Sequence, residues 1–166
     1  MEIIFDIETT GFDPMEKRIT CISLINIEHD KPVSFYGEDE SLILKQFWNV
    51  IKDGAKTISF NGDSFDIPFL IKRSLINNVP VTNLFKKHID LRKVANSFYF
   101  TYKEHEKGKL TDWGKILGID VITEDGAEMI NHYEKKDWKT IKAHCEEDVM
   151  LTKALFTRCK ECELIK

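Results

Sequence analysis

The sequence has no apolar run that approaches the roughly 20 residues needed to span a bilayer. Its first residues carry acidic groups, whereas a secretory leader begins with a basic segment followed by an apolar stretch. The chain also contains no internal repeat, no low-complexity segment and no linker-like stretch. These absences predict a protein with no membrane segment, located in the cytoplasm, whose residues 1–166 form one domain.

Cysteine is scarce, with four residues in the whole chain. Two of them, Cys159 and Cys162, form a single CxxC motif near the end of the sequence. A structural zinc site requires four ligands and usually two such pairs, and the sequence offers no second pair. We therefore expect reduced thiols on a helix rather than a zinc centre.

An excess of positive charge is also missing, because 24 Lys and Arg residues are outnumbered by 28 Asp and Glu residues. This balance alone does not indicate a nucleic-acid-binding protein, and it favours a shallow site for a few nucleotides over a long channel. The region 84–115 is locally basic and includes the aromatic segment NSFYFTY, 96–102. Aromatic rings among basic residues are typical of single-strand binding, although the same rings are equally compatible with a core.

Hydrophobic periodicity predicts an α/β fold with a mixed sheet and helices on its faces. The expected strands cover 2–8, 18–28, 32–37, 56–61 and 88–91. The expected helices cover 41–53, 65–76, 111–118 and 137–159. Pro68 is compatible with its helix only in the first turn. Thr111 is predicted to cap the N-terminus of the third helix and Gly118 to end it.

Two carboxylates stand one residue apart in the otherwise apolar first strand, at Asp6 and Glu8. Alternate residues of a strand share a face, so these two side chains would lie side by side, with Phe5 and Ile7 on the opposite face. Neighbouring anions repel each other, and partial burial strengthens the repulsion. The pair therefore predicts that a positive charge lies between the two carboxylates.

Two further acidic residues occur in positions that suit the same site. Asp66 lies near the start of a predicted helix, where a capping role is also compatible with it, and Asp148 shares a helix face with His144. Oxygen ligands on rigid elements suit Mg²⁺ or Mn²⁺, and two such ions can clamp both oxygens of a phosphoryl transfer. We expect two divalent metal ions, Mg²⁺ or Mn²⁺, held by Asp6, Glu8, Asp66 and Asp148.

Three motifs, FDIETTG, NGDSFDIPFL and HCEED, resemble in order the three exonuclease motifs of the DEDD 3′–5′ exonucleases. The second is most similar to the motif in the exonuclease domain of family-B DNA polymerases and their stand-alone relatives. The resemblance implies a ribonuclease H-like fold, with a five-stranded sheet made of a three-stranded antiparallel meander and two parallel strands, and with helices on both faces. It also implies a 3′–5′ exonuclease that releases nucleoside 5′-monophosphates from single-stranded DNA, with RNA as the alternative substrate.

The resemblance also assigns individual residues. It implies that the metal-binding and catalytic carboxylates are those of Asp6, Glu8, Asp66 and Asp148. Thr9 lies where this family contacts the terminal nucleotide, and Asn61 and Phe65 match positions close to the substrate strand. The sequence leaves protein partners unknown.

His144 departs from both branches of this family. One branch has a tyrosine at the spacing Y-x3-D, and the other has a histidine at H-x4-D, whereas this chain has a histidine at the tyrosine spacing from Asp148. A neutral imidazole accepts a proton near pH 7 more readily than a phenol does. His144 therefore either acts as a base or orients water, or the site is weakened and the chain is a nucleic-acid-binding module of the same fold. A histidine that only packs on the helix face is the third alternative.

Overall fold

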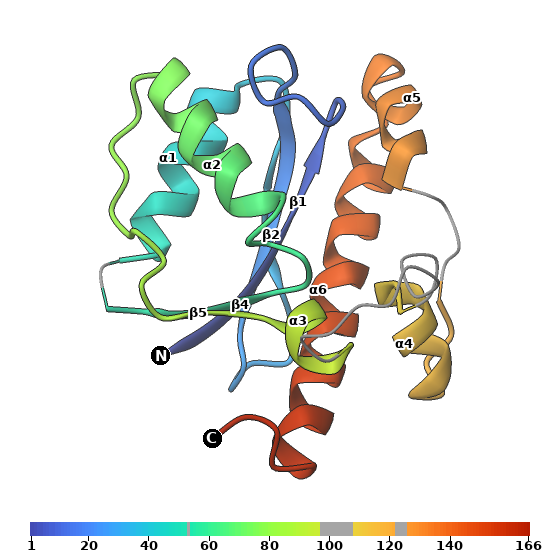
Figure 1. The fold of residues 1–166 in the computed structure, drawn as a ribbon. Helices are drawn as coiled ribbons and strands as arrows, with labels where there is room; N and C mark the ends of the chain where they lie inside the picture. Colours follow the sequence, from blue (N-terminus) through green and yellow to red (C-terminus); the bar gives the residue numbers. More distant parts are fainter. Residues whose placement is uncertain (53, 97–107, 122–125) are drawn as a thin grey trace.

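The computed structural model describes residues 1–52, 54–96, 108–121 and 126–166 (Figure 1). Its strands are β1 (Glu2–Thr9), β2 (Ile19–Asn26), β3 (Val33–Tyr36), β4 (Lys56–Ser59) and β5 (His88–Asp90). Its α-helices are α1 (Glu40–Val50), α2 (Asp66–Ile76), α3 (Leu91–Ala95), α4 (Leu110–Ile116), α5 (Met129–Glu134) and α6 (Trp138–Glu161), and a 3₁₀ turn, Gly126–Glu128, precedes α5. Most of the aromatic segment 96–102 lies outside the described residues.

The strands form a mixed sheet of the predicted kind, with the order β3-β2-β1-β4-β5 over the described part of the chain. β1 pairs antiparallel with β2, and β2 pairs antiparallel with β3, which gives the expected meander. β4 lies parallel to β1 and to β5. The centre of the sheet is therefore β1, the strand that carries Asp6 and Glu8.

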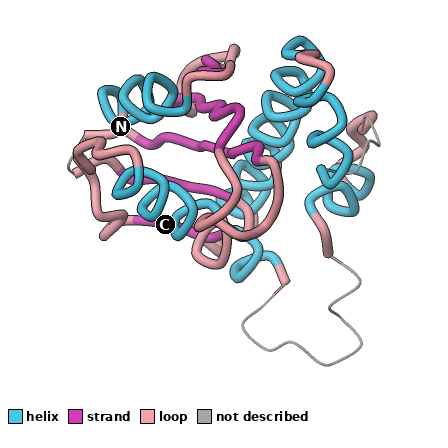
Figure 2. Tube along the Cα trace, turned by 90° about the horizontal axis from the view of Figure 1, so that it is seen from above, coloured by secondary structure: helices cyan, strands magenta, loops and turns pink. Residues whose placement is uncertain are grey.

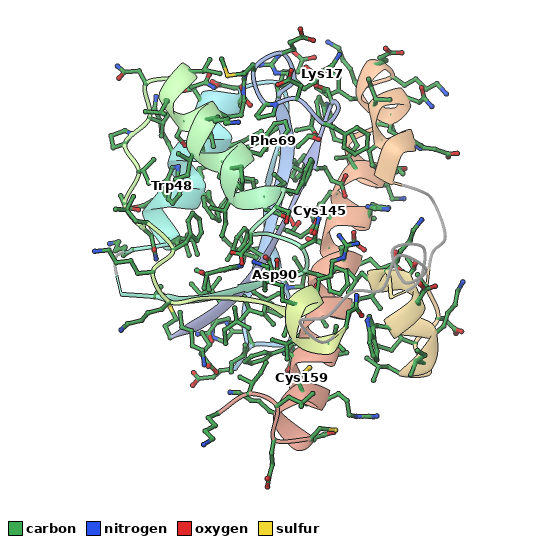
Figure 3. The ribbon with its side chains drawn as sticks, viewed as in Figure 1. Lys17, Trp48, Phe69, Asp90, Cys145 and Cys159 are labelled. Atoms are coloured by element: carbon green, nitrogen blue, oxygen red, sulfur yellow. The ribbon has the colours of Figure 1, made fainter. Side chains whose placement is uncertain are left out.

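Helices cover both faces of this sheet, as Figures 1 and 2 show: α1 and α2 lie on one face, and α6 lies on the other. Trp48 and Phe69 point into the first layer, whereas Cys159 belongs to the second (Figure 3). Phe5 packs with the first layer and Ile4 with the second. Since residues alternate along a strand, Asp6 and Glu8 share the α6 face of β1 with Ile4.

The boundaries of the helices confirm two of the local predictions and correct a third. Pro68 lies in the first turn of α2, and Gly118 follows the end of α4 with a positive φ of 75°. Thr111, however, does not cap α4, because that helix already begins at Leu110 after Lys109. The carboxylate of Asp112 accepts a hydrogen bond from the Lys109 backbone N–H at 3.0 Å, and this contact fixes the earlier start.

Two further features of the structure concern the state of the cysteines and the apolar character of the helices. All four cysteines are free thiols, with Cys159 buried on α6 and Cys162 exposed at its end. Over the parts of the chain that the structure describes, no helix combines the length and the apolar character needed to cross a membrane.

Candidate active site

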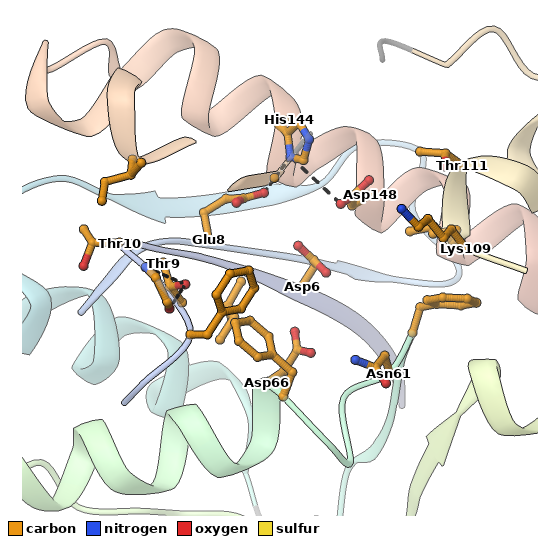
Figure 4. Close-up of a pocket in the computed structure, with 18 of the residues that line it drawn as sticks. Asp6, Glu8, Thr9, Thr10, Asn61, Asp66, Lys109, Thr111, His144 and Asp148 are labelled. Atoms are coloured by element: carbon orange, nitrogen blue, oxygen red, sulfur yellow. Dashed lines mark hydrogen bonds and ion pairs between the residues drawn. The ribbon is translucent and has the colours of Figure 1, made fainter. Parts of the chain in front are cut away.

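The carboxylates of the three motifs converge on one cavity of about 750 Å³, although they are far apart in the sequence (Figure 4). Asp6 and Glu8 enter it from β1, Asp66 from the first residue of α2, and Asp148 from α6. The fold brings them together because α6 packs against β1 and because α2 begins beside the carboxyl end of that strand. His144, one turn before Asp148, lines the same cavity.

His144 connects the first strand to the last helix. Its Nδ1 lies 2.6 Å from Oε1 of Glu8 and 3.9 Å from Oδ2 of Asp148. The side chains of Glu8 and His144 are only 7% and 11% exposed, so their contact is shielded from solvent. Ligand atoms of Glu8, His144 and Asp148 all lie within 4.8 Å of one another, close enough to surround a single ion.

Burial and mutual repulsion raise the pKa values of these carboxyl groups. Burial is the largest cause for Asp6, whose pKa lies well above its usual range, and the charges of Asp148, Asp66 and Glu8 raise it further. Burial also raises the pKa of Asp66 to about 8. For Asp148 burial raises the pKa to about 7, although His144 opposes the shift. Without a cation, the cavity therefore cannot hold all of these groups in their charged form near neutral pH.

The donor set fits a divalent metal ion. Oδ1 of Asp66 is fully buried, and the described residues provide it with no hydrogen-bond partner. A buried carboxylate oxygen without a partner is costly, whereas a cation would satisfy it and reduce the repulsion among its neighbours. The ligands are mainly hard carboxylate oxygens, which Mg²⁺ and Mn²⁺ prefer. We expect Asp6, Glu8, Asp66 and Asp148 to hold the metal.

Cys145 contacts Asp6, which the sequence did not lead us to expect. Its Sγ is 3.4 Å from the backbone oxygen of Asp6 and 3.7 Å from Oδ2. Burial raises the pKa of this thiol well above its usual range, so Cys145 remains protonated and can donate a hydrogen bond to Asp6. Its position next to His144 in the HCEED motif was the available signal, but a helix residue one position away normally points elsewhere.

The three residues predicted to contact the substrate also line the cavity. The hydroxyl of Thr9 donates to the backbone oxygen of Gly11 at 2.7 Å and shapes the turn after β1. The amide of Asn61 accepts a hydrogen bond from Arg92 at 2.8 Å. Phe65 packs edge to face against Phe12, with ring centroids 6.1 Å apart.

Sequence reasoning missed several other residues of the cavity wall. Phe12 is 80% exposed beside Phe65, and nothing in its local pattern distinguished it from an ordinary loop residue. Lys109, Thr111 and Lys115 also line the cavity, and Figure 4 shows the Lys109 side chain reaching toward it. The sequence indicated that this region is basic, but only the packing of α4 against α6 selects which lysines reach the site.

A metal titration tests this donor set through stability. Because an ion that binds only the native state stabilises it, Mg²⁺ or Mn²⁺ at about 100 times Kd should raise Tm by about 5–10 °C. Asp66→Asn should raise Tm of the metal-free protein, since it removes a carboxyl group whose charged form is disfavoured by burial, and should lose most of the metal-induced gain. Thermal unfolding with EDTA and with each metal measures both effects.

The matched control is Asp30→Asn, which makes the same chemical change at an exposed position in the turn between β2 and β3. This variant should unfold like the wild type with and without metal. The donor set proposed above would be wrong if Asp66→Asn gained as much stability from Mn²⁺ as the wild type does.

Comparison with known proteins places this arrangement in a family. The family model described as the RNase_H superfamily matches residues 3–160. The chain is 34% identical over 177 aligned residues to the uncharacterized protein MJ0365 of Methanocaldococcus jannaschii, covering 98% of this chain and 97% of that protein. The structure of the present chain is similar to that of the family B DNA polymerase of Pyrobaculum calidifontis, with a TM-score of 0.78 and 14% identity over 98% of this chain.

The chain spans only 25% of that polymerase, and at this level of identity the likeness shows the fold alone. The fold is the ribonuclease H-like one that the three motifs implied. The match to the family model covers nearly the whole chain, and the superfamily together with the acidic cavity supports a nuclease. The chain therefore belongs to the RNase_H superfamily.

Proposed function

We propose that the protein is a metal-dependent 3′–5′ exonuclease that removes nucleoside 5′-monophosphates from the 3′ end of single-stranded DNA. The observation that carries this proposal is the convergence of four carboxylates from β1, α2 and α6 on one cavity. The order of the three exonuclease-like motifs and the polymerase-like fold support it. RNA is the alternative substrate, because this carboxylate chemistry does not depend on the sugar.

The carboxylates would hold two divalent ions, Mg²⁺ or Mn²⁺. When bound, such ions make water a stronger nucleophile and stabilise the charge on the leaving oxygen. Asp6 lies between the other carboxylates (Figure 4), and after burial their charges are the next causes that raise its pKa. Asp66 is fixed at the start of α2, and its buried Oδ1 is available as a ligand.

His144 would orient the attacking water or take its proton. When Glu8 is ionised its carboxylate can only accept a hydrogen bond, so Nδ1 of His144, 2.6 Å from Oε1, carries the proton. Glu8 holds the ring in this tautomer and stabilises the imidazolium that forms.

The remaining walls of the cavity suit a single strand. Phe12 and Phe65 offer an aromatic surface on which a terminal base can stack. Lys109 and Lys115 offer positive charge for phosphates on the α4 side. Among the described residues, Lys17, Lys109 and Lys115 are the lysines and arginines that line the cavity, and this small number fits contact with only a few nucleotides.

The proposal is tested with single-stranded DNA labelled at its 5′ end, incubated with Mg²⁺, with Mn²⁺ and with EDTA. A ladder of products that shorten one nucleotide at a time, present only with metal, is the expected result. Blocking the 3′ end should stop the reaction, whereas blocking the 5′ end should not. Failure of the wild type to shorten DNA or RNA of the same sequence with either metal would refute the proposal.

Variants at position 144 separate the three roles considered for the histidine. His144→Phe keeps a ring but cannot accept a proton, so kcat should fall by at least about 10²-fold with little change in DNA binding. His144→Tyr places a hydroxyl at the spacing of the tyrosine branch and should retain more activity than His144→Phe. Steady-state kinetics and fluorescence anisotropy provide the two measurements.

A catalytically weakened nucleic-acid-binding module is the second candidate, and the histidine at the tyrosine spacing is the observation that favours it. For such a module, the wild type would bind single strands but cut them very slowly, and His144→Tyr would raise the rate. Equal rates for wild type and His144→Phe would instead leave the histidine a packing role only.

A further inference from the structure

The turn between β4 and α2 presents Asn61 to the cavity, and a buried carboxylate holds it in place. Asn61 adopts a positive φ of 68°, which a residue other than glycine keeps only when its surroundings hold it. Oδ1 of Asp90 accepts a hydrogen bond from the Asn61 backbone N–H at 2.9 Å, and Oδ2 accepts one from Asp63 at 3.3 Å. Asp90 is 6% exposed at the end of β5, so its buried carboxylate holds the turn against that strand.

Close packing under the turn leaves it little freedom. A Cβ on Gly62 would lie only 1.8 Å from Oγ of Ser59, so the backbone there must pass over β4 without a side chain. The ring nitrogens of His88, on β5, lie 3.0 Å from the Thr57 hydroxyl and 3.1 Å from the Ser59 hydroxyl. These hydrogen bonds join β5 to β4 next to the turn. The position of the Asn61 backbone is thus set by buried contacts.

The side chain of Asn61 is oriented by a different residue. Nη1 of Arg92, two residues after Asp90, lies 2.8 Å from Oδ1 of Asn61. A guanidinium has only donors, so the atom that faces Arg92 must be the amide oxygen. Nδ2 then points away from Arg92, and Figure 4 shows it directed toward the space beside Asp6 and Asp66.

We infer that Arg92 is a positioning residue that fixes the rotation of the Asn61 amide, so that Nδ2 donates a hydrogen bond to the sugar–phosphate backbone of the substrate. This inference rests on the proposed function. The backbone must pass between Asn61 and the carboxylates if its terminal phosphodiester is to be cut, and its phosphate oxygens are hydrogen-bond acceptors. A donor at this point therefore contacts the backbone rather than a base, and it adds no further negative charge to the cavity.

Two substitutions at Asn61 distinguish a donor from a structural residue. Asn61→Asp keeps the oxygen that Arg92 contacts but removes the donor, whereas Asn61→Ala removes both. Each should lower kcat/KM by about ten- to a hundredfold, the effect of losing one hydrogen bond to a charged group. Wild-type activity in Asn61→Asp would overturn the inference.

Arg92 is tested by a double-mutant cycle with Asn61. Arg92→Met should lower kcat/KM by about tenfold in the wild type but by less than about twofold in Asn61→Ala, since Arg92 acts only through that amide. Arg92→Lys keeps a donor, so it should recover part of the activity and also serves if the Met variant does not fold. Equal losses in both backgrounds would assign Arg92 an independent role and overturn the inference.

The matched control is Lys93→Met, which removes one positive charge from the neighbouring residue. Lys93 forms an exposed ion pair with Asp63. The kcat/KM of the Lys93→Met variant should differ from that of the wild type by less than about twofold, because an exposed ion pair contributes little energy. A loss as large as that of Arg92→Met would show that net charge, not amide orientation, is responsible.

The nature of the contact is tested with oligonucleotides that end in each of the four bases. If Nδ2 contacts the backbone, the penalty of Asn61→Ala should be the same within about twofold for all four. A penalty confined to one or two bases would show a base contact and overturn the assignment. If the wild type cuts none of them, the proposed function fails, whereas cleavage with additive losses refutes only the role of Arg92.

Discussion

Asp6→Asn is expected to lower the rate of DNA shortening by at least about 10³-fold, the largest effect of any single change in the protein. Asp6 stands at the centre of the cavity, and its pKa is raised by the charges of Asp148, Asp66 and Glu8 after the larger effect of burial. Asparagine keeps the shape of the side chain but removes the charge that a divalent ion requires. Gel-based cleavage rates with saturating Mn²⁺ measure the loss.

Binding should respond differently from turnover. The aromatic and basic walls of the cavity do not include Asp6, so the affinity of Asp6→Asn for single-stranded DNA, measured by anisotropy, should stay within about threefold of the wild type. Asp30→Asn makes the same change on the surface and should retain full activity. An Asp6→Asn protein that still cuts at a tenth of the wild-type rate would place the catalytic centre elsewhere.

The parts of the fold and site that the sequence predicts are those that local pattern determines. Strand alternation puts Asp6 and Glu8 on one face of β1, and helical spacing puts His144 and Asp148 on one face of α6. Both expectations concern neighbours within one element, and the structure has them as predicted. The combination of an antiparallel meander with two parallel strands followed from the resemblance, since local patterns do not determine which strands pair.

The residues that were missed depend on contacts between distant segments. Phe12 reaches the cavity because the loop after β1 folds back toward Phe65, and Arg92 matters because β5 ends beside the turn that carries Asn61. Thr111 was assigned to the wrong helix position because Asp112 reaches back to the Lys109 backbone. In each case the residue's role depends on which partner it contacts in the folded protein, and spacing in the sequence does not reveal that partner.

Glu40 is another such residue, and it carries the other large expected effect. The sequence indicated only an acidic residue near the start of a helix, whereas the structure buries its side chain to 1% exposure. Oε1 accepts hydrogen bonds from the Ile19 backbone N–H at 2.7 Å and from Nε of Arg73 at 2.9 Å. Oε2 lies 2.6 Å from Nη2 of Arg73 and 2.9 Å from the Asn77 amide. Arg73 also donates to the backbone oxygen of Pro14, so this network ties α1 and α2 to the loop after β1.

Glu40→Gln should lower the free energy of unfolding by about 3–5 kcal/mol, because it leaves the guanidinium of Arg73, whose side chain is only 12% exposed, without its counter-charge. Burial alone would raise the pKa of Glu40, but hydrogen bonds from Arg73, Ile19 and Asn77 hold it below its usual value of 4.5. A lowered native pKa means that Glu40 contributes stability above pH 4.5, and that this contribution is lost as pH falls through the native pKa. The difference between wild type and Glu40→Gln should therefore be full at neutral pH and shrink in acid, which urea unfolding at several pH values measures.

Two controls show whether the buried pair is responsible. Glu38→Gln makes the same change in an exposed ion pair with Lys136 and should cost less than about 1 kcal/mol. The double variant Glu40→Met, Arg73→Met removes both charges together and should lose less stability than the sum of its single changes, because no unpaired charge remains. If Glu40→Gln and Glu38→Gln proved equally stable, or if the double loss were additive, the network would not be what fastens the loop after β1 to the two helices.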